Sequence, residues 1–486
     1  MIRKILIYII IIGGFVSLIS VIIQKGNQTL RPAIPEISQS LVTPVYTDNA
    51  KPVEIDSSQK LLQQLINNIK YPLSILLLQL IIILLLARLF GLITKRLGQQ
   101  IVIGEIMAGI FLGPSILGWI LPGVSAFIFP HDSLISLQFL SQIGLAFFMF
   151  VIGMELDISK INDRTQDAII ISHASIIVPF FLGTCLSYFI FEELAPGSTR
   201  FISFALFMGI AMSITAFPVL ARILKERGLT RSPLGALAIT CAAADDVTAW
   251  CLLAVVIAIA KAGSVTSALF TISLVVSYIL LAIKVFKPWL QKISEKRING
   301  KQIDKTIIAL SFLILLLSAY FTEIIGIHAL FGAFLAGVIM PNNVRFKELL
   351  TDKIEDLSTV LLLPIFFAFT GLRTQIGLLN TGHLWALCGI IILIAVVGKF
   401  GGSALSARIV GRSWKESLSI GALMNTRGLM ELVVLNIGYD LKILGPEVFA
   451  IMVLMALATT LMTGPLLDMI NHFFGKGKQV DNQLPI

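Results

Sequence analysis

Long blocks of apolar residues, separated by short polar loops, run along almost the whole chain. The blocks show neither the period of two that marks a half-buried strand nor the 3.6 period of an amphipathic helix. About 20 residues of helix cross the hydrocarbon core of a bilayer, so blocks of this length predict membrane-spanning helices. We count fourteen of them, near residues 5–23, 72–94, 101–121, 134–155, 168–190, 201–223, 232–260, 264–286, 305–322, 326–341, 357–376, 383–408, 416–438 and 446–471.

The first apolar segment stands apart, because a polar stretch from about 24 to 71 separates it from the rest. Arg3 and Lys4 precede its apolar core, as in a signal peptide or a signal anchor. No small-x-small cleavage site follows clearly, so we favour an uncleaved anchor. The predicted organisation is an N-terminal anchor with an extracytoplasmic linker over 1–71, a membrane domain over 72–471 and a short cytoplasmic tail over 472–486.

The basic residues mark one side of the membrane. One set of alternate loops holds 23 Lys and Arg residues, and the opposite set, counted between segments two and fourteen, holds four, which fixes the basic side as cytoplasmic. Segments two to seven then start outside and segments nine to fourteen start inside, which suggests two six-helix halves in inverted repeat. The net charge of +9 is therefore interpreted as topology signals and contact with anionic lipid, and no nucleic-acid partner is expected.

Six ionisable residues lie deep in apolar segments, where a charge costs at least about 2.5–3.5 kcal/mol on insertion scales. They are Glu105, Asp245, Asp246, Lys399, Arg427 and Glu431. Neighbours on a helix point about 100° apart, so of Asp245 and Asp246 one can meet a base while the other faces a water-filled cavity. The alternative is that both are structural and paired to buried bases.

A buried carboxylate can bind either a proton or a metal ion, and competition for one site couples the two. Oxygen ligands also suit a small hard cation. Lys399 is either a partner for one of the aspartates or a lysine that snorkels from near a helix end. The four cysteines show no metal-ligand spacing, and no cofactor is expected.

Two motifs predict interrupted helices in the fifth segment of each half. The stretch Ser213–Pro218 contains a proline, which breaks the helix ladder one turn upstream, and Ser213 and Thr215 can satisfy the freed groups or face an ion. The second motif is Asn425-Thr426-Arg427-Gly428. Interrupted helices in corresponding positions are a pointer to a transporter site. Arg427 and Glu431 are four residues apart and can pair with each other, which favours a structural role for them.

Five motifs in this order resemble the second monovalent cation:proton antiporter family, which includes Kef-type and plant cation/proton exchanger members. They are Gly98–Pro114, Met149–Asp157, Ser213–Pro218, Ala244-Asp245-Asp246-Val247-Thr248 and Asn425–Gly428, and the resemblance runs from about 72 to 471.

The resemblance implies thirteen helices after the first segment, a dimerisation domain, and a six-helix core with two broken helices that cross near the aspartates. Asp246 matches the ion- and proton-binding aspartate, and Lys399 would pair with Asp245, a pattern that resembles electrogenic sodium/proton exchange. Thr215 would lend an oxygen near the site. The sequence departs from the Kef pattern in two ways. Kef-type members usually have Gln-Asp where this sequence has Asp245-Asp246, and they carry a large cytoplasmic nucleotide-binding domain after the last helix, where this sequence has only residues 472–486. Gating through such a domain is therefore not expected here.

The sequence thus predicts an all-α polytopic membrane protein that exchanges Na⁺ or K⁺ for H⁺ by alternating access, with Asp245 and Asp246 as ligands of the transported cation. A cation channel or ligand-gated K⁺ efflux pathway on the same scaffold is the alternative. No HExxH motif and no GxSxG in context occur, so an enzyme is not expected. We expect a homodimer in the plasma membrane of a bacterium or in an organelle or thylakoid membrane.

Overall fold

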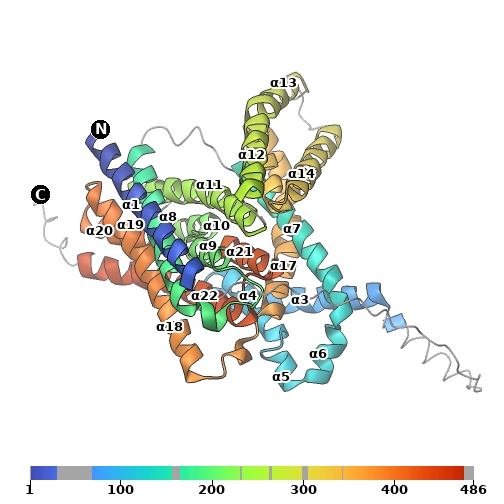
Figure 1. The fold of residues 1–486 in the computed structure, drawn as a ribbon. Helices are drawn as coiled ribbons and strands as arrows, with labels where there is room; N and C mark the ends of the chain where they lie inside the picture. The colour runs from blue at the N-terminus through green and yellow to red at the C-terminus, as the bar shows by residue number, and fades with distance from the viewer. Residues whose placement is uncertain are drawn as a thin grey trace, which may run out of the picture.

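The computed structural model describes residues 2–29, 68–69, 71–155, 165–229, 232–261, 265–297, 305–341 and 343–475, and every regular element in these ranges is a helix (Figure 1). Asp157 of the sequence motif, most of the predicted 24–71 linker and residues 476–486 of the predicted tail lie outside these ranges. The predicted all-α fold is confirmed for the residues that the structure describes.

The first group of helices contains neither Asp245 nor any described side chain that hydrogen-bonds to it. Its elements are α3 (Pro72–Arg96), α4 (Ile101–Leu112), α5 (Leu117–Ile120), α6 (Pro122–Ile128), η1 (His131–Ser133), α7 (Leu134–Glu155), α12 (Val265–Leu281), η3 (Ala282–Phe286), α13 (Lys287–Arg297), α14 (Lys305–Ile325), α15 (Ala329–Val338), α16 (Val344–Leu357), η4 (Ser358–Leu362), α17 (Leu363–Arg373) and η5 (Ile376–Leu378). Helices α12, α13 and α14 project from one end of the bundle (Figure 1).

The second group holds Asp245, Asp246, Lys399 and Glu431, whereas Glu105 lies buried in α4 of the first group. Its elements are α8 (Thr165–Leu194), α9 (Phe201–Ala211), α10 (Phe217–Glu226), α11 (Pro233–Lys261), α18 (Gly382–Val396), η6 (Val397–Gly401), α19 (Gly402–Ile409), α20 (Trp414–Met424), α21 (Leu429–Asp440) and α22 (Pro446–Gly475). The N-terminal helix α1 (Ile2–Thr29) lies along α8 and α9 (Figure 1). Without α1, this group corresponds to the six core segments that the resemblance implies, which are segments five to seven and twelve to fourteen of the sequence analysis.

Ten helical stretches in the described ranges are long and apolar enough to cross a membrane, or eleven if α20 and α21 count as one bent span. Three of the fourteen predicted segments, 5–23, 201–223 and 326–341, are not among these eleven. The segment at 326–341 contains only the ten-residue helix α15, and the segment at 201–223 is divided between α9 and α10. Thirteen helices and their inverted repeat stay predictions.

The two predicted helix interruptions are both present. Helix α9 ends before Met212 and α10 begins at Phe217, with Pro218 in its first turn, where a missing N–H costs nothing. Helices α20 and α21 meet at an angle of 42° across a break at 425–428. A backbone hydrogen bond of 3.1 Å from Ala216 N to Thr426 O joins the two breaks. The two broken helices therefore meet at their non-helical segments.

Candidate functional site

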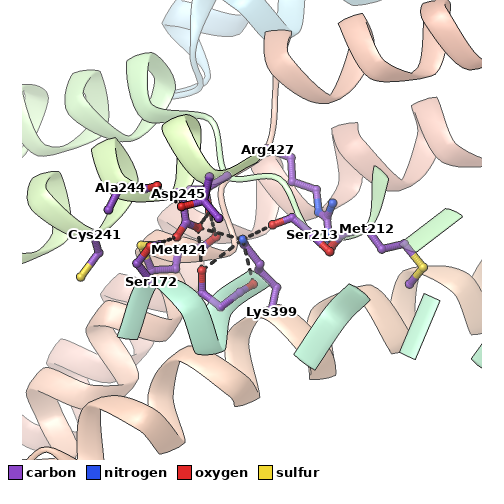
Figure 2. A network of polar contacts seen from close by, with 12 residues as sticks. Ser172, Met212, Ser213, Cys241, Ala244, Asp245, Lys399, Met424 and Arg427 are labelled. Carbon is purple, nitrogen blue, oxygen red and sulfur yellow. Dashed lines mark hydrogen bonds and ion pairs between the residues drawn. The ribbon is translucent and has the colours of Figure 1, made fainter. Parts of the chain in front are cut away.

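Asp245 lies fully buried at the centre of a dense hydrogen-bond network (Figure 2). Its Oδ1 accepts from Ser172 Oγ at 2.6 Å, and its Oδ2 accepts from Ser175 Oγ and Thr215 Oγ1, each at 2.6 Å. Lys399 Nζ donates to the same Oδ2 at 3.1 Å. One donor thus reaches Oδ1 and three reach Oδ2, so both oxygens of Asp245 are hydrogen-bonded. The predicted pairing of Lys399 with Asp245 is present in the structure.

The ammonium of Lys399 is buried as completely as its partner. Besides Asp245, it donates to the backbone oxygen of Ser175 at 3.0 Å and to that of Ser213. Both carbonyls are free to accept for reasons that the sequence contains. Pro179 lacks the N–H that would bond residue 175 in the ladder of α8, and Ser213 lies just past the end of α9. The lysine thus replaces two missing helix donors and does not snorkel.

Close helix packing brings Lys399 to α8. The lysine sits in η6, a π-helical turn of the kind that often occurs at functional sites. Gly398 precedes it, and a Cβ at that glycine would come within 3.1 Å of Pro179 Cα. A Cβ at Gly402, one turn later, would lie 3.0 Å from Val178 Cβ. The two glycines therefore let η6 and α19 approach α8 closely enough for the Lys399–Ser175 contact.

Asp246 differs from its neighbour in having no such donors. Its side chain is 1% exposed, and neither of its oxygens has a hydrogen-bond partner among the described residues. The backbone amide of Phe217, at the start of α10, lies nearby without ordinary hydrogen-bond geometry. Such a helix N-terminus favours negative charge. An unsatisfied buried carboxylate is costly, and among the described residues Asp246 is the carboxylate of the pair that has no hydrogen-bond donor.

Arg427 fills the crossing of the two broken helices (Figure 2). It is fully buried, and its Nη1 and Nη2 donate to the carbonyls of Ala211 and Met212 at 2.9 and 2.6 Å. These carbonyls end α9, where the helix dipole favours a cation. Nη1 also lies 3.3 Å from Glu431 Oε2, so the predicted ion pair with Glu431 is present. Arg427 therefore ties the end of one broken helix to the beginning of the other.

Three further predicted site residues, Ser213, Thr426 and Asn425, are also buried. Ser213 gives its carbonyl to Lys399, while its hydroxyl bonds Gly209 O of its own helix. Thr426 Oγ1 lies 3.3 Å from Thr463 Oγ1. Asn425 is buried with neither amide atom hydrogen-bonded to a described residue.

Sequence reasoning missed Ser172, Ser175 and Pro179 of α8. Serine is common in membrane helices, and its usual partner there is a carbonyl of its own helix, as for Ser187 on the same helix, which bonds Gly183 O. The proline inside α8 is the one signal that could have pointed to them, because it predicts a free carbonyl at residue 175.

Apolar spanning helices whose interrupted segments meet at buried charges form the arrangement expected of a secondary transporter. The comparisons with known proteins agree. The family model "Sodium/hydrogen exchanger, transmembrane" matches residues 81–470. The chain is 43% identical over 393 residues to the Na⁺/H⁺ antiporter NhaS4 of Synechocystis, covering 81% of this chain and 96% of that protein.

More distant relatives are longer than this chain. Cation/H⁺ antiporter 19 of Arabidopsis thaliana is 39% identical over 410 residues, which cover 84% of this chain and 51% of the relative. K⁺/H⁺ antiporter 1 of Saccharomyces cerevisiae is 33% identical, with 83% of this chain and 47% of the relative covered. The chain thus spans about half the length of the plant and yeast relatives it matches.

A solved structure shares the fold. The sodium proton antiporter MjNhaP1 of Methanocaldococcus jannaschii superposes with a TM-score of 0.59 at 15% identity, covering 83% of this chain and 98% of that one. With the family model matched over most of its length, the chain belongs to the sodium/hydrogen exchanger family and is a multi-pass integral membrane protein.

Proposed function

We propose that this protein is a secondary antiporter that exchanges Na⁺ or K⁺ for H⁺. The observation that carries the proposal is the buried carboxylate of Asp246, which has no hydrogen-bond partner among the described residues and lies near the backbone amide of Phe217 at the start of α10. The printed names of the relatives, which are Na⁺/H⁺, K⁺/H⁺ and cation/H⁺ antiporters, support the same reaction.

The exchange follows from what Asp246 can bind. A carboxylate in apolar surroundings is stable when it holds a proton or when it faces a cation. Either occupant removes the cost of an unpaired buried charge, so each displaces the other. Asp245 is already held by four donors and contributes a fixed partner for Lys399, not a second open ligand. The cation is the substrate of this site.

Alternating access accounts for the burial of the site better than a channel does. Asp245, Asp246 and Lys399 are each at most 1% exposed, so the site is closed to both sides in this conformation. A channel needs a continuous conducting path at some stage, whereas an exchanger needs occluded states. The channel alternative predicts ion flux that is not coupled to protons, and the assay below separates the two.

The test is a pH-gradient assay in proteoliposomes, with Na⁺, K⁺ or Li⁺ added to wild type, Asp246→Asn and Asp132→Asn. Asp132 is an exposed aspartate of η1 and serves as the matched control. We expect cation addition to dissipate the gradient in wild type and in the control but not in Asp246→Asn. Wild-type exchange by Asp246→Asn would refute the site, and cation flux without proton movement would favour the channel.

We further propose the organisation that the sequence suggests, with an N-terminal anchor and linker over 1–71, a membrane domain over 72–471 and a cytoplasmic tail over 472–486. The broad apolar surfaces of α3, α12 and α14 face outward and suit the proposed homodimer as well as lipid. The match to a cyanobacterial antiporter over nearly its full length supports a bacterial or thylakoid membrane.

A further inference from the structure

An apolar cavity of about 520 Å³ lies between α1, α8 and the η6–α19 segment. Helix α1 contributes Ile12 and Phe15, and the ring of Phe15 packs edge-on against Phe181 of α8 at 5.1 Å. The opposite wall includes Gly401, where a Cβ would meet no atom within 4 Å. The cavity therefore exists partly because residue 401 has no side chain.

The surroundings of the cavity define what can fill it. Its lining is apolar except for Ser406, whose hydroxyl already donates to Ser403 O at 2.9 Å, so ordered water would find almost no partners. Protein interiors are close-packed, and an empty cavity of this size loses many dispersion contacts. The occupant is therefore expected to be hydrocarbon.

The cavity also opens toward the hydrocarbon core of the lipid bilayer. Three of its lining residues, Val397, Leu405 and Ile409, are 55%, 58% and 68% exposed. They lie on an apolar stretch, 382–409, that is long enough to span the membrane, so this exposed face contacts the acyl chains of lipids.

One end of the cavity suits a lipid headgroup. Ile409 and Val410 line the cavity, and Arg408, which precedes them, is exposed and lies just outside the lining. Its Nη1 donates to Arg412 O at 2.8 Å, and its guanidinium carbon lies 5.4 Å from the ring centre of Trp414, which leaves its other N–H groups for a phosphate. Arginine and tryptophan are typical of the depth at which phosphates lie, and anionic lipids attract basic residues there.

We propose that the cavity binds one acyl chain of an anionic phospholipid whose phosphate lies at Arg408. The acyl chain would contact Ala174, Val397 and Gly401 of the cavity lining. Ala174 precedes Ser175 in the sequence, and Val397 and Gly401 lie two residues on either side of Lys399, so the acyl chain would lie next to the Lys399–Ser175 contact. The proposal does not depend on the exchange reaction.

The experiment uses the full chain in bilayers of phosphatidylglycerol that contain a trace of the same lipid with a photoactivatable group on its acyl chain. Labelled peptides are mapped by mass spectrometry without ions or a pH gradient. Wild type should be labelled on α8 and α19 more strongly than on α3, whose apolar side chains are also exposed but line no part of the cavity. Gly401→Leu, whose side chain fills the cavity, should lose this labelling several-fold and keep that of α3.

Gly389→Leu is the matched control, because Gly389 of α18 is exposed, lies outside the cavity and also has open space around its Cβ position. It should label as wild type does. If Gly401→Leu does not fold, Ala174→Leu closes the cavity from the α8 wall and should give the same loss. Arg408→Gln should weaken labelling without abolishing it. Unchanged labelling in the folded cavity-filling variant, or wild-type labelling of α8 and α19 no stronger than that of α3, would overturn the proposal.

Discussion

Replacing Lys399 by methionine tests the buried network most directly, because methionine keeps much of the side-chain stem and removes the ammonium. The change leaves Asp245 without its cation and the carbonyls of Ser175 and Ser213 without their donor. Removing one partner of a buried ion pair costs about 3–5 kcal/mol, and each orphaned acceptor costs about 1–3 kcal/mol. We therefore expect the free energy of unfolding to fall by about 3–5 kcal/mol or more.

The measurement is equilibrium unfolding in mixed micelles with a rising fraction of SDS. The matched control is Arg227→Met, which breaks an ion pair with Asp468 at 2.5 Å whose side chains are 28% and 68% exposed. Exposed pairs contribute about 0–1 kcal/mol, and the bond that Arg227 Nη2 donates to Gly464 O at 3.1 Å adds about 1 kcal/mol, so the control should lose clearly less than Lys399→Met. Adding Asp245→Asn to Lys399→Met should recover part of the loss, since the carboxylate that the first change leaves unpaired is then removed. A loss below about 1 kcal/mol for Lys399→Met would refute the reasoning.

Three further outcomes are expected. Thr215→Val removes one hydrogen bond to Asp245 and should lower the unfolding free energy by about 1 kcal/mol, with little change in apparent cation affinity; a large affinity change would make this hydroxyl a cation ligand. Pro179→Ala restores an N–H that competes with Lys399 for Ser175 O and should slow exchange in proteoliposomes, whereas a wild-type rate would show that the missing donor is unimportant. Lys399→Met should also alter the charge moved per cycle, measured as the voltage dependence of uptake, and unchanged dependence would exclude its part in electrogenic exchange.

The spanning helices were predictable from the sequence because apolar length alone decides them, as in α8 and α22. The breaks at Met212 and Asn425 were predictable as well, since Pro218 and Gly428 disfavour a continuous helix there. The actual number of spans was not, because a ten-residue helix such as α15 reads as a full span when apolar loop residues flank it.

The site was predictable only in its charges. A carboxylate pair in hydrocarbon is conspicuous, but the direction of each side chain depends on which helix packs beside it. The sequence left open whether Asp245 or Asp246 met the base, and the resemblance pointed to Asp245. The serines of α8 and the carbonyl partners of Arg427 depend on tertiary packing, of which Pro179 is the one local sign in the sequence.

The bond that joins the two broken helices uses main-chain atoms only, from Ala216 N to Thr426 O. Any residue but proline supplies the same amide at position 216, and every residue supplies the carbonyl at 426. This contact is therefore nearly independent of amino-acid identity, unlike the bonds that Arg427 donates to Ala211 and Met212. Laboratory evolution of ion preference can vary side chains along both unwound segments while this one connection is inherited unchanged.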